Sequence, residues 1–364
     1  MAITKDQVLA ALRTVQDPEL FKDIVTLNMV KEVRVDGSAV FVNVELTTPA
    51  CPLKERIERD VTEAVKQAGA TEVKVELSAS TRSAPGPKKD VLPQVKNVVA
   101  VGAGKGGVGK STVALNLAIG LQRDGASVGL MDGDIYGPSM PTMLGIKGIM
   151  PSMAPPAPGA KGSSKILPHF VHGIHAVTIG SLVEQDKPLI WRGPMAHGAF
   201  RQLLIENTEW PELDYLIVDL PPGTGDVPLT LCQLLPLTGA VVVATPQQVA
   251  LDDAVRAIKM FQQLNTSILG IVENMSYMLL PDGSEYDFYG RGGTERMAQE
   301  LGLPFLGSLP MVTDLRINCD AGTPTLNFQN PPQLAKALVK LAENLAGQIS
   351  VHNLSTTGPQ LNVT

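Results

Sequence analysis

The run from Asn97 to Thr112, NVVAVGAGKGGVGKST, constrains the fold more than any other part of the sequence. It starts with a continuous apolar stretch, which is typical of a strand buried on both faces of a parallel sheet. A glycine-rich loop follows, in which Gly104 to Ser111 fits the pattern G-x-x-x-x-G-K-[ST]. A glycine-rich turn that binds nothing is the alternative. The strand before the loop and the helix after it favour a phosphate-binding loop.

Further apolar runs predict a doubly wound α/β domain with a mostly parallel sheet over residues 97–346. They are ASVGLMD (126–132), DYLIVDL (214–220), GAVVVAT (239–245) and SILGIVEN (267–274), and helical stretches separate them. The chain has 364 residues, which is long for one domain. A helix over 4–15, a hairpin around Asp36-Gly37, a helix over 52–69 and a strand over 72–77 predict a small α/β domain at 1–80. Residues 81–96 are interpreted as a linker, and the polar residues 347–364 as a disordered tail.

Composition excludes several classes of function. The net charge of −6 disfavours nucleic acid as a partner. No run is apolar and long enough for a membrane helix, and the first residues carry no apolar signal segment. The three cysteines are an odd and sparse set, which favours reduced thiols in a cytoplasmic protein.

The loop predicts binding of ATP and Mg²⁺. Glycines let backbone N–H groups turn toward phosphate oxygens, and the next helix presents its positive end to the same anion. Lys110 reaches the β- and γ-phosphates, and the Ser111 hydroxyl ligates Mg²⁺. The expected nucleotide-binding residues are Gly104, Lys105, Gly106, Gly107, Val108, Gly109, Lys110, Ser111 and Thr112.

Carboxylates at the ends of two other strands complete the expected site. Asp219 ends the run YLIVD, and Asp132 and Asp134 follow the run beginning at Ala126. Ligands of open α/β sheets lie at the carboxyl ends of the strands, where a magnesium–nucleotide site needs carboxylates. The alternative for each aspartate is a cap on the helix that follows.

KGGVGKST resembles the deviant Walker A motif of the family that contains division-site and plasmid-partitioning ATPases and the nitrogenase iron protein. The resemblance implies a homodimer in which Lys105 reaches the partner's phosphates and stabilises charge on the transferring group. It also implies that Asp132 activates or positions the attacking water, while Asp134 and Asp219 hold Mg²⁺ and the switch loops. A solvated loop lysine is the alternative for Lys105.

Longer stretches resemble the Mrp-type iron–sulfur cluster carriers. They include DGDIYGPSMPTMLG, DYLIVDLPPGTGDVPLTL, GIVENMSY and YGRGGTERMAQELGLPFLGSLPM. DPELFKDIVTLNMVKEV and TTPACPLKERI resemble the small domain fused upstream in many such carriers. The resemblance implies an ATPase that binds an iron–sulfur cluster and transfers it to apoprotein clients, with assembly scaffold proteins as partners. It also implies that Asn274 contacts adenine, and an Asn capping a turn is the alternative.

One departure concerns the cluster ligands. Members of the resembling family carry C-x-x-C soon after ENMSY, whereas Leu280-Pro-Asp-Gly283 stands there in this chain. Cys51, which precedes a helix, is the remaining candidate for an iron–sulfur ligand, with an inert small residue as the alternative. Cys232 and Cys319 are expected to be structural, and His169, His172 and His175 to be a solvated loop rather than a metal site. A nucleotide-switched scaffold or positioning ATPase without its own cluster therefore stays open.

Overall fold

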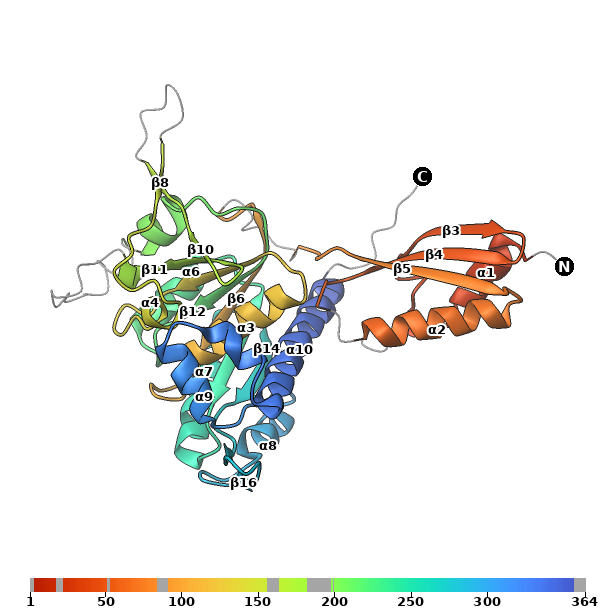
Figure 1. Cartoon of the computed structure of the whole chain (residues 1–364). Helices are drawn as coiled ribbons and strands as arrows, with labels where there is room; N and C mark the ends of the chain where they lie inside the picture. Colours follow the sequence, from red (N-terminus) through yellow and green to blue (C-terminus); the bar gives the residue numbers. More distant parts are fainter. Residues whose placement is uncertain are drawn as a thin grey trace. The chain divides into compact units, whose positions relative to one another are not determined.

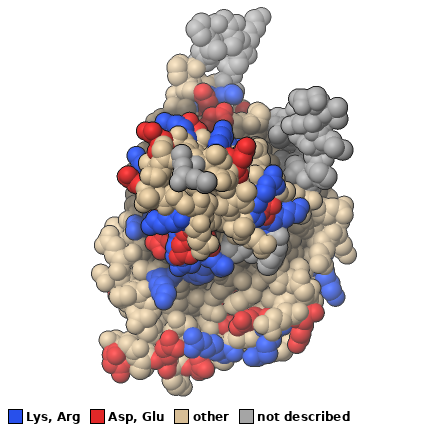
Figure 2. Space-filling model, turned by 90° about the vertical axis from the view of Figure 1, so that its right-hand side faces the viewer, with Lys and Arg blue, Asp and Glu red and all other residues tan. Residues whose placement is uncertain are grey.

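The computed structural model describes residues 3–17, 22–50, 53–83, 91–155, 164–181, 198 and 200–356. The chain divides into two compact units, Met1–Arg82 with Ser350–Thr364 and Ser83–Ile349. Each unit is described by itself. Figure 1 shows the elements, and Figure 2 shows acidic and basic side chains interspersed over one face of the molecule.

The small unit is a three-stranded sheet with two helices on one face. Its elements are α1 (Lys5–Leu12), β1 (Gln16–Asp17), β2 (Lys22–Asp23), β3 (Val30–Asp36), β4 (Ala39–Leu46), α2 (Lys54–Gln67) and β5 (Glu72–Ala79). β3 and β4 form the expected hairpin, and Gly37 in its turn has φ 62°. β5 runs parallel to β4 because α2 crosses over between them. Alternate β4 side chains from Val40 to Leu46 are buried in one core with residues of α1 and α2.

The large unit is built on an eight-stranded sheet in the order β10-β11-β7-β12-β6-β13-β14-β17. All neighbouring strands are parallel except the edge strand β10, which is antiparallel to β11. The strands are β6 (Val95–Gly102), β7 (Val128–Asp132), β10 (His169–Val171), β11 (Ile174–Thr178), β12 (Leu213–Asp219), β13 (Gly239–Ala244), β14 (Ile268–Glu273) and β17 (Phe305–Ser308). The predicted doubly wound α/β class is therefore confirmed.

Helices cover both faces of this sheet (Figure 1). One face packs on α6 (Asp226–Leu234), α7 (Gln248–Gln263) and α8 (Gly293–Glu300), whose apolar side chains share a core with alternate residues of β6 and β12. The other carries α3 (Lys110–Arg123) and α10 (Pro332–Thr356), which approach closely where Gly120 faces Ala342. Shorter elements are α4 (Met140–Met143), η1 (Ile179–Ser181), η2 (Phe200–Glu206), α9 (Thr313–Asp320) and η3 (Pro324–Phe328).

Two expectations differ from the structure. The last helix extends to Thr356, so residues 347–356 are helical rather than part of a disordered tail, and 357–364 lie outside the described residues. Gly347 lies inside this helix, and Ile349 and Asn353 beyond it are buried. The histidine segment is a strand hairpin, with His169 on β10 and His175 on β11.

Two small hairpins lie outside the main sheet. They are β8 (Met153–Ala154) with β9 (Lys165–Ile166), and β15 (Met278–Leu279) with β16 (Glu285–Tyr286). Among the described residues, no helix is long and apolar enough to cross a membrane.

Candidate nucleotide-binding site

The phosphate loop joins the central strand β6 to α3 at the carboxyl edge of the sheet. Gly107 and Gly109 both have φ 81°, a left-handed conformation that glycine adopts at little cost. A Cβ atom on Gly104 would overlap the Asp253 carbonyl on α7, and one on Gly109 would overlap the Asn274 side chain. Gly109 is therefore required by its backbone conformation and by close packing, and Gly104 is required by close packing.

Lys110 brings together three of the predicted site residues. Its Nζ lies 2.6 Å from Asp219 Oδ1 and 3.5 Å from Asp134 Oδ2. It also donates to the Ser111 hydroxyl at 3.1 Å. The lysine is only 6% exposed, so these contacts form in a largely water-excluded pocket where charge interactions are strong.

Asp219 has one oxygen available for a cation. It is completely buried, and its Oδ2 has no hydrogen-bond partner among the described residues. Burial raises the pKa of this carboxyl, and the charge of Lys110 opposes the increase. An unpartnered buried oxygen beside the Ser111 hydroxyl suits Mg²⁺, which prefers hard oxygen ligands.

The same cation would need ligands from the nucleotide. No group of three or more His, Cys, Asp or Glu side chains that could hold a metal occurs in the described part of the chain. Mg²⁺ commonly binds through one or two carboxylates, with water and substrate phosphates completing its shell. Ser111, Asp219 and Asp134 fit that pattern. The second Asp134 oxygen accepts from the N–H groups of Tyr136 and Gly137, so this residue also caps a turn.

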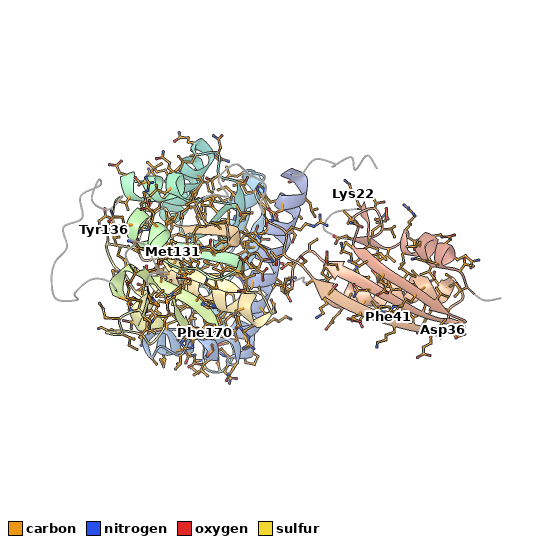
Figure 3. All side chains as sticks on the ribbon, turned by 90° about the horizontal axis from the view of Figure 1, so that it is seen from above. Lys22, Asp36, Phe41, Met131, Tyr136 and Phe170 are labelled. Carbon is orange, nitrogen blue, oxygen red and sulfur yellow. The ribbon has the colours of Figure 1, made fainter. Side chains whose placement is uncertain are left out.

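Asp132 is held in a fixed orientation at the end of β7. Its Oδ1 accepts from the Asp134 N–H at 3.1 Å, and its Oδ2 accepts from the Thr178 hydroxyl at 2.7 Å. Burial, and then repulsion from Asp219, raise the pKa of Asp132 to about 7. Its neighbours Met131 and Tyr136 differ in position: Met131 lies inside the large unit, whereas Tyr136 reaches its surface (Figure 3).

Lys105 does not join this cluster. It is half-buried in the loop and forms no ion pair within the described residues. The two loop lysines therefore have different surroundings: Lys110 is paired with buried carboxylates, and Lys105 has its ammonium free of them. Action on a partner's phosphates stays a prediction.

Asn274 supports the phosphate loop. Its amide donates to the Val108 carbonyl at 2.9 Å, and its backbone N–H donates to Ala244 at the end of β13. This contact ties the end of β14 to the loop. The predicted contact with adenine is not tested by it.

A chain of amides supports the first turn of α3. Asn116 donates to the Thr112 carbonyl at 2.8 Å, Asn327 donates to Asn116 at 3.1 Å, and Asn318 donates to Asn327 at 3.0 Å. Asn116 and Asn327 are both buried. The phosphate-binding helix is thus connected by hydrogen bonds to η3 and α9.

Sequence reasoning missed three residues that shape the site. Thr178 bonds Asp132, and the Gly223 N–H donates to the Ala103 carbonyl at 2.9 Å, which links the loop after β12 to the phosphate loop. Glu273, fully buried, accepts from Gly292 and Thr294 N–H groups and so holds the start of α8. A polar residue at the end of an apolar run was the available signal for Thr178 and Glu273.

Two of the three cysteines, Cys232 and Cys319, lie within the described residues. Cys51 lies outside the described residues. Cys232 is buried in α6, where desolvation raises the pKa of its thiol to about 12, and burial also raises the pKa of Cys319 on α9. The segment Leu280 to Gly283 forms the turn of the β15–β16 hairpin, where Asp282 accepts from the Ser284 N–H and hydroxyl.

Two family models match the chain. Residues 94–346 match the family described as NUBPL iron-transfer P-loop NTPase, and residues 5–77 match the iron-sulfur cluster assembly protein family. A Synechocystis protein named iron-sulfur cluster carrier protein is 48% identical over 96% of this chain and 99% of its own length. Proteins of the same name from Deinococcus radiodurans and Escherichia coli are 48% and 39% identical, over 98% and 94% of this chain and 99% and 91% of their own lengths.

Solved structures agree with the fold. A nucleotide-binding protein from Archaeoglobus fulgidus in complex with ADP is 34% identical, with a TM-score of 0.57 over 68% of this chain and 94% of that chain. An ATP complex of McdA from Cyanothece matches 68% of this chain and 96% of that chain with a TM-score of 0.51 at 18% identity, which supports the fold alone. With a matching phosphate-loop domain and relatives that align along nearly their whole length, the chain belongs to the NUBPL iron-transfer P-loop NTPase family.

Proposed function

We propose that this chain is an ATP-binding, slowly ATP-hydrolysing carrier that works as a homodimer in the cytoplasm and transfers iron–sulfur clusters to apoproteins. The observation that carries the ATPase part is the convergence of Lys110, Ser111, Asp134 and Asp219 behind the phosphate loop. The carrier part is supported by the printed names of the relatives and by the match of residues 5–77 to an iron–sulfur assembly family. Assembly scaffold proteins would supply the cluster.

Binding of ATP would redistribute the contacts of Lys110. Phosphate oxygens would compete with Asp219 for the ammonium, and Asp219 and Ser111 would be the residues that hold Mg²⁺. Mg²⁺ supplies neutralisation of the charge that develops on the phosphate oxygens. Backbone N–H groups of the loop and the start of α3 hold the same oxygens.

Asp132 would orient the attacking water. It is buried next to the cluster with both of its oxygens in hydrogen bonds, so its carboxylate has a fixed direction. A burial-raised pKa suits a group that takes a proton near neutral pH. Lys105, whose ammonium has no partner among the described residues, would stabilise the transition state in the second subunit.

Exchange of the two lysines for alanine tests this division of roles. Lys105→Ala should retain ATP binding and lose most hydrolysis, whereas Lys110→Ala should weaken ATP binding itself. Nucleotide titration and phosphate release are measured for both variants. Wild-type hydrolysis by Lys105→Ala would refute the proposed role of Lys105. Mixing this variant with Lys110→Ala subunits tests whether Lys105 acts across the dimer.

The cluster ligands are the least constrained part of the proposal. Iron–sulfur clusters are held mainly by thiolates, and the buried thiols of Cys232 and Cys319 are disfavoured as thiolates by their raised pKa values. Cys51 is therefore the proposed ligand, and a dimer would provide two copies. The remaining ligands would come from outside the chain, such as a small thiol or a partner protein.

Anaerobic reconstitution distinguishes a carrier from a switch. Iron and sulfide per dimer are counted for the wild type, for Cys51→Ser and for the control variants Cys232→Ser and Cys319→Ser. Loss of iron in Cys51→Ser alone supports the carrier. The absence of cysteine from the exposed turn 280–283 favours a second candidate, a nucleotide-switched scaffold or positioning ATPase. A wild type that never retains iron would support that candidate.

A further inference from the structure

Thr178 occupies the position opposite Asp132 in the sheet. It is the last residue of β11, which runs parallel to β7 in a register that pairs Thr178 with Asp132. Both side chains are almost completely buried, with 2% and 1% of their surfaces exposed. The two residues are far apart in sequence and meet only because β11 adds to the sheet beside β7.

The Thr178 hydroxyl has a fixed direction. It donates to Asp132 Oδ2 at 2.7 Å and accepts from the Gly180 N–H at 3.2 Å. The Gly180 N–H takes one of its two lone pairs, and because a carboxylate only accepts, the hydroxyl proton is directed to Asp132. A hydrogen bond to an ionised acceptor is stronger than one between neutral groups.

The carboxylate of Asp132 is thereby held at both oxygens. Thr178 contacts Oδ2, and the Asp134 N–H contacts Oδ1 at 3.1 Å. A carboxylate has about four lone-pair sites, so two hydrogen bonds leave acceptor capacity for a water molecule. Without the hydroxyl, rotation about the Cβ–Cγ bond would be opposed at one oxygen only.

We propose that Thr178 is a positioning residue for ATP hydrolysis, which sets the direction in which the Asp132 carboxylate faces the attacking water. This inference rests on the proposed role of Asp132 in hydrolysis. Misplacement of a reacting group by about 1 Å can lower a rate about 100-fold, so orientation of a single carboxylate has a measurable effect. Thr178 would act through Asp132 and would not contact ATP.

Thr178→Val tests the proposal, because valine has nearly the shape of threonine and lacks the hydroxyl. We expect kcat to fall about 10- to 100-fold, with KM for ATP and the Kd of a fluorescent ATP analogue changed less than about threefold. Thr178→Ser, which restores the donor, should recover kcat to within about threefold of the wild type. The unchanged Kd of the valine variant also shows that its nucleotide site is folded.

Thr238→Val is the matched control. Thr238 is also buried, and its hydroxyl accepts from the Val98 N–H at 3.1 Å at the start of β13, away from the carboxyl edge. This variant loses a comparable backbone contact, and its kcat should stay near the wild-type value. An equal loss of kcat in Thr238→Val and Thr178→Val would overturn the proposal, as would failure of serine to restore activity.

Asp132→Asn separates this inference from the function on which it rests. If Asp132→Asn is inactive and Thr178→Val hydrolyses ATP like the wild type, the inference fails while the role of Asp132 stands. If Asp132→Asn keeps wild-type hydrolysis, the role of Asp132 fails, and the inference fails with it. If both variants lose activity, the double variant should be no slower than Asp132→Asn alone, because Thr178 then has no carboxylate to orient.

Discussion

Lys110 should stabilise the nucleotide-free protein as well as bind ATP, and Lys110→Ala measures this. The substitution removes the cation that lies 2.6 Å from Asp219 and 3.5 Å from Asp134. Asp219 has no exposed surface, so its charge is left at a poorly solvated position. Removing one member of a buried ion pair typically costs about 3–5 kcal/mol, which is the expected loss in the free energy of unfolding. Lys105→Ala, at a half-buried position without an ion pair in the described residues, should change it by less than about 0.5 kcal/mol.

The stability lost in Lys110→Ala should depend on pH in a defined direction. Burial raises the pKa of Asp219, and the charge of Lys110 lowers it, so the variant has a higher folded-state pKa than the wild type. A carboxyl with a raised folded-state pKa destabilises the protein as pH rises above its unfolded value, because ionisation is then favoured by unfolding. The difference between variant and wild type should therefore grow as pH rises above the ordinary carboxyl range, by at most about 1.4 kcal/mol per pH unit.

Urea unfolding without nucleotide provides the measurement. Trp210 is buried in the large unit. Replacing the other tryptophan, Trp191, by phenylalanine in every protein that is compared leaves Trp210 as the only tryptophan that contributes to the fluorescence signal. Lys110→Ala combined with Asp219→Asn should recover at least half of the lost stability, since the buried charge is removed as well. A loss below about 1 kcal/mol at pH 8 would refute the conclusion that the Lys110–Asp219 pair is a buried, charged contact.

Two further predictions concern the loop and the thiols. Gly109→Ala should cost about 1–3 kcal/mol in urea unfolding and weaken ATP binding, because it strains a left-handed residue and displaces Asn274. Gly106→Ala, with open space around it in the nucleotide-free protein, should be nearly neutral in urea unfolding. Equal effects of the two substitutions would contradict the packing described. Cys232 and Cys319 should resist alkylation by iodoacetamide at pH 8 in the folded protein and react in urea, as followed by mass spectrometry, and rapid labelling of either folded thiol would show that its burial is wrong.

The central strands could be predicted from the sequence because they are buried on both faces. β6, β12 and β13 each appear as a continuous apolar run, and the runs have no other reasonable structure between helical stretches. The strands β11 and β17 were not predicted. β17 has four residues including a glycine, and β11 contains a histidine, so neither forms a long apolar run. Their place in the sheet depends on pairing with neighbours that are distant in sequence.

The residues of the site also divide into those that local sequence predicts and those that depend on strand pairing. Asp219 and Asp132 could be predicted because strand ends meet at one edge of a parallel sheet. The contact of Thr178 with Asp132 could not, because it arises from the register between β11 and β7, which no local pattern specifies. For Asn274 the family resemblance implied a contact with adenine, which stays a prediction. The structure shows a hydrogen bond to the Val108 carbonyl that depends on the approach of β14 to the loop.

The amide chain beneath α3 has a polarity. Asn318, Asn327 and Asn116 donate successively in one direction, and the last donates to the Thr112 carbonyl. Aligned amide dipoles polarise one another, so reversing one Asn would break the bonds on both sides of it. The chain therefore couples the position of the phosphate-binding helix to the positions of η3 and α9. The first turn of α3 can shift on ATP binding only if η3 and α9 follow it or if a buried amide gives up its partner.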